Sequence, residues 1–290
     1  MTRRPLLLWG CAVLLYGFLY APLLMVMVFS FNAAPHGGPW QGFTTAWYMK
    51  LLSFDSAINI SAGDRKAAQE KRQAVKNTLI LATVSATVAT VLGTMLGYGL
   101  RRYQFPGKRL WSWVLYIPVV VPDIVMAVAM LLFFALLRAW SAWLLAWFGY
   151  VQTGIFTLGM TTMMLAHITF QIPFVAIVVR ARLLGMDPAI EEAAHDLGAN
   201  TWQTFWRITF PLMLPGVLAG GLLAFTLSLD DFVVSFFTTG PGATTLPILI
   251  YSSVRRGITP DINALSTLLV VASVIGTLGI TLLQRPRQSL

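Results

Sequence analysis

Long apolar runs separated by short polar segments dominate the sequence. A helix that crosses a bilayer needs about 20 mostly apolar residues, and six segments reach this length: residues 6–31, 77–100, 110–137, 153–179, 214–237 and 264–283. Strands in lipid would have to close into a barrel of alternating segments of about 10 residues. These runs are longer and do not alternate, so the pattern predicts an all-α membrane protein with six transmembrane helices.

Composition narrows the class of protein further. Of the 290 residues, 57% are hydrophobic and 11% are charged, whereas a soluble domain carries about 25% charged residues. Disordered chains are rich in charge and poor in aromatic side chains, which excludes disorder here. A secreted disulfide scaffold needs several cysteines, and Cys11 is the single cysteine of the sequence.

The basic residues set the expected orientation in the membrane. The net charge is +9, and the basic residues are scattered along the chain, so no nucleic-acid partner is expected. With a cytoplasmic N-terminus, 11 basic residues fall inside and 9 outside, and six of those nine lie in the first outer loop, residues 32–76. The short basic connection at 101–109 favours this orientation, which places both termini in the cytoplasm. The first outer loop does not follow the rule.

The N-terminal region is similar to a signal peptide, because two arginines precede its apolar run. The run continues to Phe31 and no small-residue cleavage site follows it, so we expect an uncleaved anchor with Cys11 as a small apolar residue inside it. Residues 32–41 are rich in Pro and Gly and are expected to be irregular. Residues 62–76 are charged and lack Pro, which favours a short solvated helix leading into the second span.

The most informative stretch follows the fourth span. Asp187 is expected to cap a helix that has Pro188 at its first position. Two acids, Glu191 and Glu192, then fall in the first turn, where the helix dipole favours negative charge.

Two helix ends are expected further along this stretch. Gly198 with Asn200 is expected to end the first helix, and a second helical piece over residues 201–208 is expected to stop before Pro211. An ordinary amphipathic connector at the membrane surface would share this composition.

The spacing of residues in this stretch is specific. It contains six fixed positions of a known pattern: Glu192-Ala193-Ala194, three residues, Gly198, nine residues, Ile208, one residue, Phe210-Pro211. The pattern resembles the EAA loop of ABC importer permeases, EAA-x3-G-x9-I-x-L-P. The one departure is Phe210 in place of Leu, which exchanges one apolar residue for another.

The resemblance implies a type I ABC importer permease in a bacterial inner membrane, with an N-terminal transmembrane helix and a periplasmic loop in residues 1–76 and a permease domain in residues 77–284. Residues 187–211 would form a loop that docks on a separate ATPase subunit. The coupling residues would be Glu191, Glu192, Ala193, Ala194, Gly198, Ile208 and Pro211. The implied partners are a second similar permease, two ATPase subunits and a periplasmic binding protein.

The chain lacks the G-x-x-x-x-G-K-[ST] phosphate-binding motif. We therefore expect a transporter subunit that is not an enzyme and has no cofactor, with ATP and Mg²⁺ bound by the partner ATPase. Gly93, Gly97 and Gly99 are spaced for close helix packing in lipid. The three histidines are far apart and show no metal-ligand spacing. His167 lies in a span, where we expect a hydrogen-bonded packing residue.

Three acids lie within the predicted spans: Asp123, Asp230 and Asp231. Ionisable groups in a membrane are costly and are functional candidates by default. A carboxylate that lines a watery path would suit a cationic substrate. The alternative is an Asp that caps or pairs at a helix break. Adjacent helix positions point about 100° apart, so one Asp of the pair can face a path while a neighbouring helix holds the other.

A second resemblance covers most of the chain. Its segments are residues 20–22, 29–32, 225–231, 239–247, 251–254 and 260–264, and they resemble the polyamine importer permeases, most closely the putrescine branch. Putrescine is therefore the expected substrate, and spermidine or another small cation remains open. A proton-coupled secondary transporter, with Asp230 or Asp231 carrying the proton, is the alternative from another class.

Overall fold

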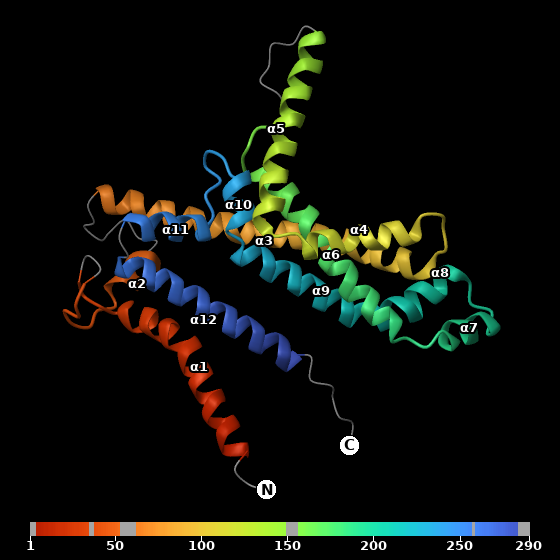
Figure 1. The fold of residues 1–290 in the computed structure, drawn as a ribbon, viewed down its shortest axis with the longest axis horizontal. Coiled ribbons are helices and arrows are strands. Elements are labelled where there is room, and N and C mark those ends of the chain that lie inside the picture. The colour runs from red at the N-terminus through yellow and green to blue at the C-terminus, as the bar shows by residue number, and fades with distance from the viewer. Residues whose placement is uncertain (1–3, 35–37, 53–61, 149–155, 257–258, 284–290) are drawn as a thin grey trace. The chain divides into compact units, whose positions relative to one another are not determined.

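The computed structural model describes residues 4–34, 38–52, 62–148, 156–256 and 259–283 (Figure 1). The chain divides into two compact units, residues 1–72 with 249–290, and residues 73–248. The elements in the described residues are all helices, and β-pairing there is limited to an isolated bridge between Asn32 and Phe43. The predicted all-α class is confirmed.

Five helices in the described part of the chain are long and apolar enough to cross a membrane. They are α1 (Arg4–Phe29), α3 (Ala62–Arg102), α5 (Asp123–Trp147), α6 (Met160–Leu184), and the helix formed by α8 (Thr201–Thr204), a π turn and α9 (Phe210–Asp230). The sixth predicted span coincides with α12 (Pro260–Leu283), whose apolar stretch is described as far as Val271. Part of the fourth predicted span, residues 153–155, lies outside the described residues.

In the first unit, α1 packs along α12, and α12 contacts the short helix α2 (Ala46–Leu52). The helix predicted for residues 62–76 is present, but it runs without a break into the second span as one 41-residue helix. Lys71 in this extension forms an ion pair with Asp261 at the start of α12. Lys71 is one of the basic residues that depart from the orientation rule, and this ion pair gives it a structural role.

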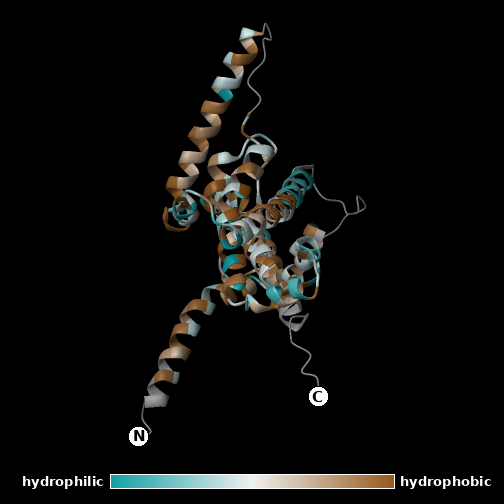
Figure 2. Ribbon diagram, turned by 90° about the vertical axis from the view of Figure 1, so that its right-hand side faces the viewer, coloured by the Kyte–Doolittle hydropathy of each residue, from teal (hydrophilic) through white to brown (hydrophobic). Residues whose placement is uncertain are grey.

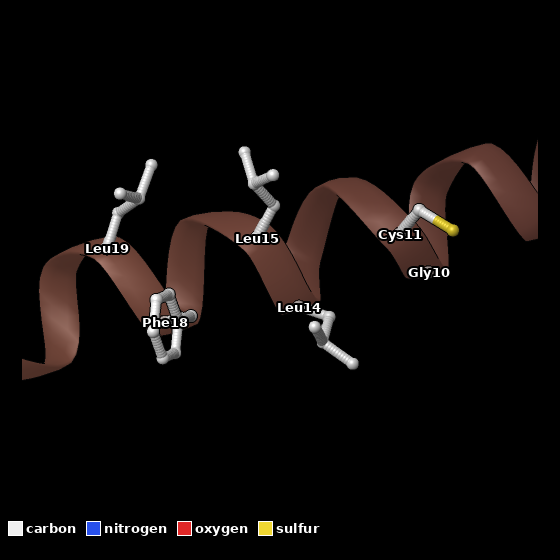
Figure 3. Close-up of a pocket in the computed structure, with 6 residues that line it drawn as sticks. All are labelled: Gly10, Cys11, Leu14, Leu15, Phe18 and Leu19. Atoms are coloured by element: carbon white, nitrogen blue, oxygen red, sulfur yellow. The ribbon is translucent and has the colours of Figure 1, made fainter.

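Helix α1 has an apolar and exposed surface. Figure 2 shows most of this helix, which leads to the N-terminus, in brown. Leu14 and Phe18 are 75% and 79% exposed, and their side chains project from one helix together with those of Leu15 and Leu19 (Figure 3). Such a surface suits contact with lipid, as the anchor interpretation expects.

In the second unit, α6 is the central helix and packs against α9, against α4 (Lys108–Val120) and against α10 (Val233–Thr238) (Figure 1). Glycines allow α3 to approach it closely. A Cβ added at Gly93 would lie 2.7 Å from the Val175 Cβ, and one at Gly97 would lie 2.7 Å from the Ala176 carbonyl oxygen. The prediction of close packing is correct for these two glycines and wrong for Gly99, which faces open space.

Helix α9 approaches α6 in the same way, which the sequence analysis missed. A Cβ added at Gly216 would lie 2.7 Å from the Arg182 Cβ, and one at Gly220 would lie 3.1 Å from the Val175 Cγ1. The two glycines are four residues apart, so they lie on one face of α9. A small-xxx-small pattern was the available signal.

The third predicted span, residues 110–137, is two helices and not one. Helix α4 ends at Val120 and α5 begins at Asp123, with Val121 in an extended conformation (ψ 131°). The cause is local, because a proline disfavours the helical conformation of the residue before it, and Pro122 follows Val121.

The fifth predicted span, residues 214–237, is also broken. Helix α9 ends at Asp230, Asp231 is extended (φ −62°, ψ 122°), and the short helix α10 follows. No proline or glycine stands at this break, so the sequence carries no backbone signal for it. The contacts that hold the break are described below.

Candidate functional sites

The predicted coupling segment, residues 187–211 and called the coupling segment below, begins with α7 (Ala189–Asp196). The Asp187 Oδ1 accepts a hydrogen bond from the Ala189 backbone N–H at 3.0 Å, so this carboxylate satisfies an N–H at the start of the helix from one residue before the N-cap. Pro188 occupies the N-cap position. The sequence had predicted it one position later, as the first residue of the helix.

Helix α7 ends in a glycine turn. Gly198 has φ +86°, in the left-handed region that glycine adopts without strain. The Gly198 N–H donates to the His195 carbonyl oxygen at 2.9 Å, and the Ala199 N–H donates to the Ala194 carbonyl oxygen at 3.0 Å. These two bonds define a Schellman motif, so the predicted helix stop at Gly198 is confirmed.

Asn200 begins the next helix, α8, and does not end α7 as predicted. Its Oδ1 accepts from the Gln203 N–H at 2.9 Å, and the Gln203 Oε1 accepts from the Asn200 N–H at 3.0 Å. This reciprocal pair is a capping box. The N-x-x-Q spacing in the sequence was sufficient to find it.

The second helical piece does not stop before Pro211. Helix α8 passes through a π turn, Phe205–Thr209, directly into α9. At the end of this turn the Phe210 N–H donates to the Phe205 carbonyl oxygen. The wider i→i+5 register shifts the hydrogen-bond ladder at the point where Pro211 has no N–H to donate, so the helix tolerates the proline.

The two adjacent glutamates of α7 have different environments. The Glu191 Oε2 lies 2.5 Å from the Arg102 Nη1 at the end of α3, and its Oε1 accepts from the Thr209 hydroxyl at 2.7 Å. Glu191 therefore fastens α7 to α3 and to the π turn. Glu192, one position further on, is exposed to solvent.

The other residues predicted to act in coupling differ in their exposure. Ala194 is buried and Ile208 is half-buried, whereas Ala193 and Pro211 are exposed. Two large apolar side chains that the sequence analysis did not select are also exposed, Leu197 at 89% and Trp202 at 71%. A bulky apolar residue beside the helix-ending glycine of a polar helix was the available signal.

Asp231 lies at the break between α9 and α10. Its carboxylate accepts hydrogen bonds from the Val234 N–H at 3.2 Å and from the Ser235 N–H at 2.7 Å. Two free N–H groups at the start of α10 are thereby satisfied. The Asp231 side chain is 12% exposed, and its Oδ2 lies 3.3 Å from the Nε2 of the fully buried His167 on α6.

His167 connects this break to the rest of the second unit. Its Nδ1 lies 2.8 Å from the Ser228 hydroxyl on α9, and its Nε2 lies 3.0 Å from the Ser235 hydroxyl on α10. The Ser228 hydroxyl lies 3.2 Å from the Ser85 hydroxyl on α3. This buried polar network confirms the expectation that His167 is a hydrogen-bonded packing residue.

The other two acids of the spans are exposed. Asp230 is the last residue of α9 and Asp123 is the first residue of α5, and neither side chain is buried. Asp230 and Asp231 therefore differ in the way that the sequence allowed for, one open to the surroundings and one held by a neighbouring helix. All three acids lie at helix breaks.

The family of the chain is shown by comparison with known proteins. Residues 89–285 match the family described as binding-protein-dependent transport system inner membrane component. The chain belongs to this family and is a permease subunit of a transport system in the inner membrane. It is thus a transporter component and not an enzyme.

Two relatives from Escherichia coli strain K12 are similar over nearly the whole chain. The spermidine/putrescine transport system permease protein PotC is 40% identical over 97% of this chain and 95% of its own length. The putrescine transport system permease protein PotI is 40% identical over 97% of this chain and 89% of its own length.

Solved structures agree on the fold. A bacterial ABC transporter involved in import of the acidic polysaccharide alginate matches with a TM-score of 0.73 at 20% identity, covering 99% of this chain and 98% of that one. The MetNI methionine ABC transporter matches with a TM-score of 0.58 at 20% identity, covering 77% of this chain and 97% of that one. The chain therefore has the fold of an ABC importer permease.

Proposed function

We propose that this chain is the permease subunit of an ABC importer for polyamines, with putrescine as the main substrate. The observation that carries the proposal is the 40% identity, over 97% of the chain, to two permeases whose names both include putrescine. Spermidine is the second candidate, because it is part of one of these names. The family assignment favours an ATP-driven importer over a proton-coupled secondary transporter.

The proposed assembly contains a second similar permease, two ATPase subunits that bind ATP and Mg²⁺, and a periplasmic polyamine-binding protein. The coupling segment would lie in the cytoplasm, where ATP is available, and both termini would lie on the same side. Residues 32–76 would then lie in the periplasm, and residues 77–284 would form the permease domain.

The ATPase contact would be the outer face of the coupling segment. Glu192, Ala193, Leu197 and Trp202 are exposed there and offer one charge beside apolar surface. Glu191, Ala194 and Ile208 are buried or half-buried and would hold the segment in shape. This division supports a rigid element that transmits movement from the ATPase to the spans during alternating access.

The substrate path would use the exposed acids. Asp230 and Asp123 present open carboxylates that would balance the charge of a cationic polyamine, as candidate path residues at helix breaks. Asp231 would act differently, because its carboxylate is already hydrogen-bonded to α10 and lies beside His167. Its part would be to hold the break that presents Asp230.

The test is uptake by the reconstituted importer. The chain is assembled with its partner permease, its ATPase and its binding protein in liposomes, and ATP-driven uptake of labelled putrescine is measured. We expect saturable uptake that Asp230→Asn lowers at least several-fold. Glu70→Gln removes an exposed acid of α3 that precedes the predicted second span, residues 77–100, and should leave the rate unchanged.

Two results would contradict the proposal. Putrescine uptake by the chain alone, driven by a proton gradient without ATP, would favour the secondary transporter. ATP-driven uptake that responds equally to Asp230→Asn and Glu70→Gln would remove Asp230 from the path while leaving the substrate class intact.

A further inference from the structure

A basic pocket of about 550 Å³ lies between α4 and α6 in the second unit. It is lined by charged, hydroxyl and aromatic side chains, including Lys108, Arg109, Ser112, Trp113 and Tyr116 from α4, and Arg180 from α6. The coupling segment does not line this pocket, and neither do the three acids of the proposed path.

The pocket forms because helix periodicity aligns several side chains of α4 and because one side chain of α6 reaches them. Lys108, Ser112 and Tyr116 are spaced four residues apart, so they share one face of α4. Arg109 and Trp113 repeat this spacing on the adjoining strip. The Arg180 Nη1 reaches across from α6 towards the Ser112 hydroxyl at 3.5 Å, which places a third cation beside the two adjoining strips of α4 that carry Lys108 and Arg109.

The positive charge of the pocket is not balanced within the described part of the chain. The ion pairs found there join Lys71 to Asp261, Arg102 to Glu191 and His167 to Asp231, so none involves Lys108, Arg109 or Arg180. Three cations around one cavity with no carboxylate pair favour an anion with several acceptor oxygens. A phosphate group suits them, since guanidinium groups bind phosphate oxygens in a bidentate fork.

The surroundings of the pocket indicate a lipid as the source of that phosphate. The exposed face of α4 continues from the basic end through Trp113, Ile117 and Val120, which are 62%, 54% and 78% exposed. Trp and Tyr side chains are typical of the depth at which lipid headgroups lie. A charged head with two apolar chains matches a basic pocket that opens onto an apolar helix face, whereas a free phosphate ion would leave that face uncovered.

We propose that this pocket binds the headgroup phosphate of an anionic phospholipid, with the acyl chains lying along α4. Basic pockets between transmembrane helices at a membrane surface are suited to such headgroups. A zwitterionic lipid would bring its own cation and gain less from the three basic side chains. The inference rests on the membrane location of the family and not on the substrate that is transported.

The test is lipid binding by the full-length chain, purified with any subunits that copurify and observed by native mass spectrometry. Dioleoyl phosphatidylglycerol and dioleoyl phosphatidylcholine are titrated separately, inorganic phosphate is added in competition with bound phosphatidylglycerol, and the bound fraction is measured. We expect phosphatidylglycerol to bind more tightly than phosphatidylcholine. Arg109→Gln should weaken it about fivefold, and Arg109→Gln with Arg180→Gln about 25-fold, because each cation near an anionic surface contributes about a fivefold factor.

The controls separate charge from folding. Arg109→Lys keeps the cation and should retain most of the binding, while Arg138→Gln removes an exposed cation of α5 outside this pocket and should not change it. Circular dichroism checks that each variant keeps its helix content. If the double variant does not fold, Arg109→Gln alone still gives the fivefold comparison.

Three outcomes would overturn the proposal. Equal binding of phosphatidylglycerol and phosphatidylcholine would show that charge does not select the ligand. Equal loss in the Arg109→Gln and Arg138→Gln variants would show that the pocket is not the site. Displacement of phosphatidylglycerol by inorganic phosphate at millimolar concentration would assign the pocket to a free anion.

Discussion

The coupling segment and the buried polar network both consist of polar groups at a helix break, but their partners come from different distances along the chain. In the coupling segment, the backbone and capping bonds that shape α7 and α8 join residues at most five positions apart, as between Ala199 and Ala194. Glu191 adds longer-range contacts to Arg102 and Thr209. In the network, His167 of α6 joins Ser228 of α9 and Ser235 of α10, more than 60 positions away.

This difference predicts different responses to mutation. A surface turn held by its own backbone keeps the protein folded when its outer side chains change, so the loss should appear in transport. A buried network leaves unsatisfied polar groups when one member is removed, so the loss should appear first in stability. The variants below are ordered from the largest expected effect to the smallest.

The glycine turn should give the largest effect on transport. Gly198→Asp places a side chain at φ +86°, which costs about 1–2 kcal/mol locally, and adds a negative charge next to the proposed ATPase contact. We expect ATP-driven uptake to fall to background while immunoblots show normal membrane insertion. Gly185→Asp is the matched control, because Gly185 is exposed and the nearest atom to its added Cβ is 3.6 Å away. Normal uptake by Gly198→Asp would refute the coupling role.

The buried histidine should give the largest effect on stability. His167→Ala leaves Ser228, Ser235 and Asp231 without this partner, and unsatisfied buried groups cost about 1–3 kcal/mol each. We expect the Tm of the detergent-solubilised protein to fall by about 10 °C. His195→Ala removes an exposed histidine of α7 and should change the Tm little. Similar Tm values for both variants would mean that the network does not stabilise the fold.

The two adjacent glutamates should show the smallest difference in stability. Glu191→Gln removes the ion pair with Arg102, whose side chain is 42% exposed, so the expected loss of stability is only about 0.5–1 kcal/mol. Glu192→Gln changes an exposed side chain and should leave the Tm unchanged. Thermal unfolding of both variants measures the difference. An equal shift in both would remove the distinction between the inner and outer glutamate.

The sequence predicted local features well where a short-range signal existed. The Asp187 hydrogen bond at the start of α7 and the Gly198 turn follow from residue types at fixed spacing, and Gly93 and Gly97 pack closely as expected. Two wrong predictions also concern features that nearby residues signal. Asn200 and Gln203 form a capping box that was visible but not used, and Pro122 signalled the break between α4 and α5, which was predicted as one span.

Other features had no signal of this kind. The break between α9 and α10 has no proline or glycine, and only the assembled helices show that Asp231 caps α10 beside His167. The partial burial of Glu191 against Arg102 also depends on how α7 lies on the end of α3.

The sequence by itself predicted the all-helical membrane class, the positions of most apolar helices and the helix stop at Gly198, because hydrophobic length and fixed spacing are properties of neighbouring residues. The tertiary structure alone decided which polar groups are paired and which are open. Asp230 and Asp231, like Glu191 and Glu192, are identical in chemistry and adjacent in the chain. Contacts from distant helices and turns separate each pair into one held and one exposed carboxylate.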